Sequence, residues 1–356
     1  MLEMKTHRLS SLAILTVLFF GFVGPMVTLS AAAAQPYKIL KTTQTMGSGA
    51  IDYVYADNDD HRLYIPRGNQ VLVFDLGTLK SVGTIENTRA RGVAVDPKSG
   101  HGFCSSSPVV MWDTKTLKPI KTIEVQGRPD GILFEPATER IYVFSHAAPN
   151  ATVIDSKDGA VVGTIDLGGA PEQAASDGKG KLFVTLEDKD KIAVVDVKEL
   201  KVIGNYDLAG KGGGPAGLGF DVKNHVLFAF CHEPATAVII NSDDGKIITT
   251  LPIGKGVDGG GFNPHTMEAF SSQGDGTLTI IKEKSPTEFE VAQTVETKPR
   301  GKTCTLDTKN DHIIVITTEA APPGAVLTTS TPAEEPGKKA RKGSGPGMLD
   351  IIVIGR

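Results

Sequence analysis

The sequence predicts an all-β protein, a seven-bladed β-propeller with four antiparallel strands in each blade. Short runs rich in Val and Ile alternate with Gly, Pro, Asp and Asn along the chain, which contains 40 glycines. These runs recur in groups of four, with a period of about forty residues. The two ends of the sequence supply complementary parts of one last group, so the ring of blades can close.

Polar residues at fixed places mark the strands of each blade. The third strand of six blades ends at Asp75, Asp113, Asp155, Asp196, Asn241 or Lys282, and the fourth follows in forms such as SVGTIEN and VVGTIDL. Short polar side chains of this kind favour the tight turns that join antiparallel strands. The first strand ends seven times in a turn, at Asp57, Asp96, Glu135, Asp177, Asp221, Asn263 and Asp307.

The seventh blade is predicted to combine both ends of the sequence. Its first strand lies near Cys304, its second at 313–316 and its third at 348–354, and Arg356 follows. Residues 37–42 match the fourth-strand pattern just before blade one begins at Gly49. We therefore expect the N-terminal strand to complete the last blade, which removes an exposed sheet edge.

Residues 1–34 have the three parts of a signal peptide. Lys5 and Arg8 precede an apolar run over 12–27, and small residues lead to Gln35. We expect cleavage after Ala34 and a periplasmic or secreted propeller over 35–356. An uncleaved membrane anchor is the alternative, although the run is short for a span. After cleavage we expect no membrane span, a net charge of −5, calculated from −4 for the full chain by removing residues 1–34, and a monomer.

One segment does not fit the repeat. Residues 319–347 are rich in Pro, Gly, Ala and Thr, and such a composition does not build a packed core. We expect a disordered insertion between the second and third strands of blade seven, with a basic cluster at 338–342.

The three cysteines, Cys104, Cys231 and Cys304, fall in different blades. The sequence has no CxxC or CxxCH motif, so neither a dithiol redox site nor covalent haem is expected. We interpret all three as buried free thiols, and no cofactor is predicted.

The blade pattern, with an acid-Pro turn, IYVF, LFVT or LYIP in the second strand and VVGTI in the fourth, resembles the YVTN repeat of exported YncE-like β-propellers. The resemblance covers residues 36–356 and implies a binding scaffold whose partner is a small ligand, a protein or a cell-envelope component. Nucleic acid is not expected as a partner, because the chain is acidic and Trp112 is its only tryptophan.

The repeat also predicts a candidate ligand site. In a propeller, the loops from fourth to first strand and from second to third strand share one face, here called the funnel face. Arg128 and Arg300 are expected just outside the centre of that face, and His146 and His232 occupy the second set of loops. The residues expected to ring the axis, called the axial ring, are Asp52, Arg91, Asp130, Glu172, Asp258 and Lys302, with Ala216 in blade five.

Two functions remain open. The first is a binding module without catalysis, because the sequence shows no catalytic motif. The second is an enzyme, either a quinoprotein-like dehydrogenase or a metal-dependent lactonase or lyase. The lactonase would hold a cation on Asp52, Asp130, Glu172 and Asp258 and use His146 or His232 as base. Because Arg91 and Lys302 would repel a cation, no metal site is predicted.

Overall fold

The computed structural model describes residues 1–2, 35–148, 150–323 and 346–356, and the propeller spans Pro36–Arg356. The predicted signal peptide and most of the predicted insertion, including its basic cluster, lie outside the described residues. No described helix is long and apolar enough to cross a membrane.

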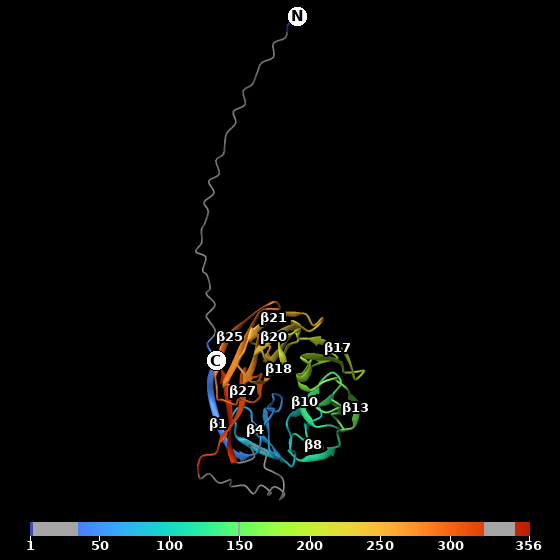
Figure 1. The fold of residues 1–356 in the computed structure, drawn as a ribbon, viewed down its shortest axis with the longest axis vertical. Helices are drawn as coiled ribbons and strands as arrows, with labels where there is room; N and C mark the ends of the chain where they lie inside the picture. The colour runs from blue at the N-terminus through green and yellow to red at the C-terminus, as the bar shows by residue number, and fades with distance from the viewer. Residues whose placement is uncertain (3–34, 149, 324–345) are drawn as a thin grey trace. The chain divides into compact units, whose positions relative to one another are not determined.

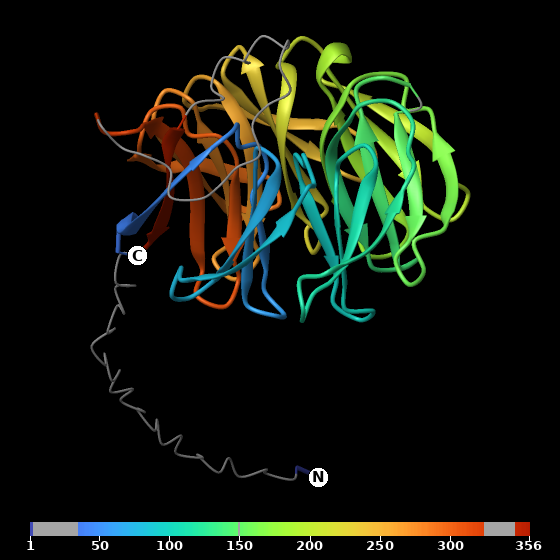
Figure 2. The same cartoon turned by 90° about the horizontal axis from the view of Figure 1, so that it is seen from below.

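Seven separate sheets of four antiparallel strands surround one axis, as Figure 1 shows, so the predicted fold is confirmed. Seen from the side in Figure 2, the strands of each blade run between the two faces of the ring. Blade one contains β2 (Tyr55–Asp57), β3 (Arg62–Arg67), β4 (Gln70–Asp75) and β5 (Ser81–Glu86). Blade two contains β6 (Val93–Asp96), β7 (His101–Cys104), β8 (Val109–Asp113) and β9 (Pro119–Ile123).

The next blades repeat this order from the axis outward. Blade three contains β10 (Pro129–Glu135), β11 (Arg140–Ser145), β12 (Ala151–Asp155) and β13 (Val161–Ile165). Blade four contains β14 (Pro171–Ser176), β15 (Lys181–Leu186), the short 3-10 helix η1 (Glu187–Lys189), β16 (Lys191–Asp196) and β17 (Lys201–Asp207). Blade five contains β18 (Gly213–Asp221), β19 (Val226–Glu233), β20 (Thr236–Asn241) and β21 (Ile247–Pro252). Blade six contains β22 (Val257–Asn263), β23 (Glu268–Gln273), β24 (Thr277–Ser285) and β25 (Glu288–Glu296).

Blade seven combines the two ends of the chain, as predicted. It contains β26 (Cys304–Asp307), β27 (His312–Ala320), β28 (Pro346–Gly355) and, as its outer strand, β1 (Lys38–Ser48). The strands are longer than the sequence indicated: β27 and β28 extend into both ends of the segment expected to be disordered. The reason is the pairing, because Ala320 opposes Gly347, which in turn opposes Gly47 of β1.

The repeated acid at the end of the first strand has a structural role. Asp57 and Glu135 are buried, and their carboxylates accept hydrogen bonds from backbone N–H groups of the following turn. The carboxylate of Asp75 accepts a hydrogen bond of 2.7 Å from the Thr78 N–H in the turn after the third strand. The period that identified the fold is thus a period of turn-capping side chains.

The core lies between neighbouring blades, where apolar faces of the sheets pack together. Tyr64 of blade one and Trp112 of blade two, for example, have ring centroids 6.0 Å apart. The three cysteines are free and buried, as the sequence indicated.

The inner strands of neighbouring blades approach one another closely where they carry glycine. The inner strands β18 and β22 approach so closely that a Cβ on Gly217 would lie 2.9 Å from the carbonyl carbon of Gly259. Glycine on these strands therefore lets blades five and six meet.

Candidate functional site

Five of the six charged residues of the axial ring contact one another in the order of the blades, from Asp258 to Asp130. The Lys302 ammonium bridges Asp258 and Asp52, with Nζ 3.4 Å from Asp52 Oδ1. The Arg91 guanidinium bridges the next two carboxylates, at 2.7 Å from Asp52 Oδ2 and 3.3 Å from Asp130 Oδ1. These five residues of the predicted ring thus form a continuous chain of ion pairs.

His146 continues the chain into blade four. Its Nε2 atom lies 2.9 Å from Asp130 Oδ2 and 3.0 Å from Glu172 Oε1. These two carboxylates raise the pKa of His146 to about 10. The imidazole therefore takes the place of a cation in the alternation of acids and bases.

The alternation ends at Glu172. Its next neighbour is Glu187, the first residue of η1, and burial together with the Glu172 carboxylate raises the pKa of Glu187. His232 of blade five lies 3.8 Å from Glu187 on the other side. Two carboxylates thus stand side by side, and their mutual repulsion favours any cation that binds between them.

The charge of the whole group is negative. Five carboxylates, Asp52, Asp130, Glu172, Glu187 and Asp258, face the two fixed cations Arg91 and Lys302. Burial raises the pKa of Asp52, although Lys302 opposes the shift. For Lys302, burial lowers the pKa, but Asp258 and Asp52 outweigh that effect and the net shift is upward. The funnel face therefore favours the binding of cations over anions.

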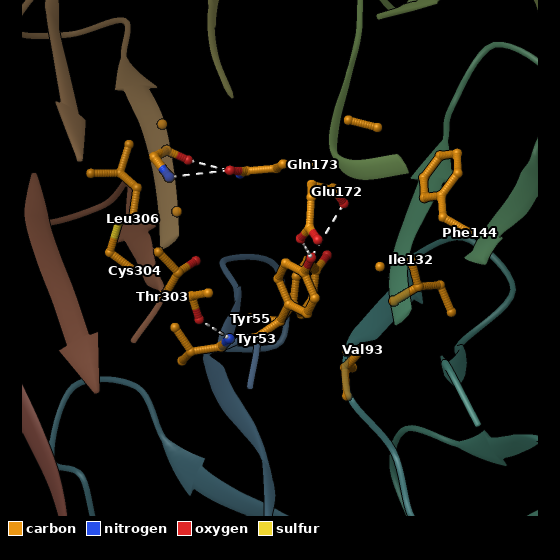
Figure 3. A pocket seen from close by; sticks show the side chains of 18 of the residues that line it. Tyr53, Tyr55, Val93, Ile132, Phe144, Glu172, Gln173, Thr303, Cys304 and Leu306 are labelled. Carbon is orange, nitrogen blue, oxygen red and sulfur yellow. Dashed lines mark hydrogen bonds between the residues drawn. The ribbon is translucent and has the colours of Figure 1, made fainter. Parts of the chain in front are cut away.

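A cavity of about 230 Å³ adjoins the ring along the axis (Figure 3). Glu172 belongs to both the ring and the cavity wall, and aromatic rings of Tyr53, Phe144, Phe262 and Phe270 also line it. The Tyr53 hydroxyl donates a hydrogen bond of 3.0 Å to Glu172 Oε2. An acid beside aromatic rings suits a small organic cation, which is attracted by both.

Gln173 closes the wall of the cavity toward blade five. Its side chain donates to the Gly260 carbonyl at 2.8 Å and accepts from the Leu218 and Gly260 N–H groups at 3.0 and 3.1 Å. Figure 3 shows this side chain reaching across to β22, the inner strand of blade six. The inner strand of blade five is the one that does not line the cavity.

Other predicted site residues do not join the ring. Arg128 and Arg300 are exposed and form no ion pair with any of the residues that the structure describes. His232 reaches the ring through Glu187 and not directly. Asp52 and Asp258, which the lactonase alternative assigned to a metal, are each bound to Lys302.

Sequence reasoning missed Glu187, Tyr53 and Gln173. Glu187 follows β15 as His146 follows β11, so the alignment that selected His146 contained the signal for Glu187. Tyr53 and Gln173 follow ring residues, at a position that is glycine in four blades: Gly92, Gly131, Gly217 and Gly259. The signal in the sequence was a large side chain at a position where four other blades have glycine.

No protein-family model and no curated protein matches the chain. Several solved structures match it. A chain of a mitotic checkpoint complex matches with a TM-score of 0.69 at 12% identity, over 85% of this chain and 95% of that one. The WD40 repeats of RRP9 match with a TM-score of 0.69 at 9% identity, over 89% and 97%. A chain of Kuenenia stuttgartiensis hydrazine synthase matches with 0.65 at 15% identity, over 75% and 92%. At these identities the likeness shows the fold, a β-propeller like those of WD40 proteins.

Proposed function

We propose that this chain is an exported β-propeller of the YncE-like kind that binds a small organic cation at its funnel face and performs no catalysis. The observation that carries the proposal is the break in the alternation at Glu172 and Glu187. Asp52, Asp130 and Asp258 each contact Arg91 or Lys302, whereas Glu172 and Glu187 contact the histidines His146 and His232 and lie next to each other beside an aromatic-lined cavity. A ligand ammonium or guanidinium group would supply the missing positive charge.

The fold supports a binding role, because propellers similar to this one occur in assemblies such as the mitotic checkpoint complex. Fold alone does not define a ligand, so the proposal depends on the site. The signal-peptide pattern supports export.

A thermal-shift screen in the presence of a chelator tests the proposal. Arginine, choline and spermidine should raise the melting temperature, because a ligand that binds the native state stabilises it by mass action. Glutamate and citrate should not. The variant Glu187→Gln should lose most of the shift, whereas Glu199→Gln, an exposed acid of the same blade paired with Lys201, should keep it. Equal shifts for amines and anions, or an unchanged Glu187→Gln variant, would contradict the proposal.

A further inference from the structure

Two carboxylates of the axial ring and the nearby His146 each direct one donor atom to the same point. These atoms are Asp130 Oδ2, His146 Nε2 and Glu172 Oε1, and ligand atoms of these three residues lie within 4.8 Å of one another. The set contains one imidazole nitrogen and two carboxylate oxygens, from two adjacent blades. Nitrogen and oxygen donors without a thiolate suit zinc and its neighbours among the divalent first-row metals.

The position of the imidazole nitrogen does not match an ordinary hydrogen bond. His146 Nε2 is buried and lies 2.9 and 3.0 Å from two acceptor oxygens, so its single N–H group faces two acceptors and forms no well-aligned hydrogen bond with either. When a nitrogen and an oxygen bind one metal ion at about 2.1 Å, they lie about 3.0 Å apart in octahedral coordination and about 3.4 Å apart in a tetrahedral site. The observed separations match the octahedral spacing.

The second carboxylate oxygen of Asp130 and that of Glu172 each lie next to a side chain outside the proposed ligand set. Arg91 lies 3.3 Å from Asp130 Oδ1, and the Tyr53 hydroxyl donates to Glu172 Oε2 at 3.0 Å. Each carboxylate therefore directs one oxygen to the point of convergence, while the Arg91 charge lies beside the other oxygen of Asp130 and the Tyr53 hydroxyl holds the other oxygen of Glu172. Outer partners of this kind are typical of protein metal sites.

Burial supplies a further argument. Asp130 is only 7% exposed, and its Oδ1 atom accepts no hydrogen bond, although the Arg91 charge lies nearby. Burying such a carboxylate is costly unless a partner compensates it. Arg91 contacts Oδ1 and leaves Oδ2 available, so its charge does not occupy the point of convergence.

We propose that Asp130, His146 and Glu172 form a binding site for one divalent transition-metal ion. The site differs from the cation site of the lactonase alternative, because His146 is a ligand and Asp52 and Asp258 take no part. It shares Glu172 with the organic-cation site proposed above, but the two tests are distinguishable: that one is performed with a chelator present and depends on Glu187, whereas this one depends on His146 and Asp130.

Equilibrium dialysis of the purified protein against Zn²⁺, with metal analysis by mass spectrometry, tests this site. We expect one Zn²⁺ per chain, and we expect Co²⁺ at the same site to give a visible absorption spectrum. His146→Gln and Asp130→Asn should each weaken binding at least tenfold, while circular dichroism confirms that they fold. Tyr53→Phe should weaken it about tenfold, as for outer partners of metal ligands.

The matched control is His265→Gln. His265 Nδ1 lies 3.0 Å from Asp311 Oδ1 in an exposed His–carboxylate pair outside the ring, so this variant should bind Zn²⁺ like the unmodified protein. Two results would overturn the proposal. One is a protein that binds neither Zn²⁺ nor Co²⁺; the other is a folded His146→Gln variant that binds Zn²⁺ as tightly as the unmodified protein.

Discussion

The hydroxyl of Tyr37 donates a hydrogen bond of 2.8 Å to the buried carboxylate of Glu268, 231 residues later in the chain. Burial and the Glu268 carboxylate raise the pKa of Tyr37 to about 12. The guanidinium of Arg356 lies 4.2 Å from the centre of the Tyr37 ring and also contacts Glu268. Both ends of the propeller segment thus meet on blade six, next to the blade that they complete.

Removing the hydrogen bond between Tyr37 and Glu268 should destabilise the closure of the propeller. Tyr37→Phe should lower the free energy of unfolding by about 1–3 kcal/mol, because the buried Glu268 oxygen loses a donor. Deleting residues 37–45 should have a much larger effect and cause aggregation, since β28 loses its partner strand. Denaturant unfolding measures both. Val161→Ala on the exposed β13 is the control and should change stability by less than about 0.5 kcal/mol; unaltered unfolding of the deletion variant would refute the closure.

Because the inner strands pack closely, we expect alanine to affect stability differently at two glycine positions. A Cβ on Gly217 would meet the backbone of Gly259 and Gly260 at 2.9 and 3.0 Å, whereas a Cβ on Gly204 would meet nothing within 4 Å. Gly217→Ala should therefore destabilise the protein by about 1–3 kcal/mol, the usual cost of overpacking. Gly204→Ala should be neutral or slightly stabilising. Thermal unfolding distinguishes them, and equal melting temperatures would show that blades five and six are not in close contact.

A buried acid outside the ring predicts a pH dependence of stability. Burial raises the pKa of Glu283 to about 7, and the nearby Asp221 carboxylate adds to the shift while Asn224 opposes it. The folded state binds this proton more tightly than the unfolded state, so its contribution is complete below about pH 4.5 and is lost as the pH rises to about 7. Glu283→Gln should remove this loss, and its melting temperature should exceed that of the unmodified protein at pH 8. Parallel pH profiles for the two proteins would show that Glu283 titrates normally.

The cysteines give a chemical test of the blade assignment. Burial raises the pKa of Cys104 and Cys304 to about 11 and that of Cys231 to about 12. Because only thiolates react rapidly, the native protein should react slowly with a thiol reagent, and the denatured protein should release three equivalents. Mass spectrometry without reductant should find three free thiols. A disulfide within the chain would mean that the cysteines are closer than the fold permits.

The fold was predictable because each repeat has turn-forming residues at the same positions. Asp57, Glu135 and Asp307 end their strands where the period placed them. The same alignment placed Asp130 and Glu172 on the axis.

What the sequence did not reveal depends on side-chain direction. The period does not say that His146 lies between two carboxylates, nor that Glu187 of a short 3-10 helix turns toward Glu172. The lengths of the strands in blade seven could not be predicted either. Ala320 and Gly347 have no strand-forming side chain, and they are extended because they pair with each other.

The central claim is that Glu172 and Glu187 together bind a cationic ligand. Calorimetric titration of arginine, choline and spermidine, with chelator present, tests it most directly. At least one of the three should bind, with an affinity that falls as salt rises, since the attraction is between charges. The Glu172→Gln/Glu187→Gln double variant should lose at least tenfold in affinity, and Glu199→Gln should lose none. Absence of binding by all three amines, or a double variant that binds as tightly as the unmodified protein, would contradict the account.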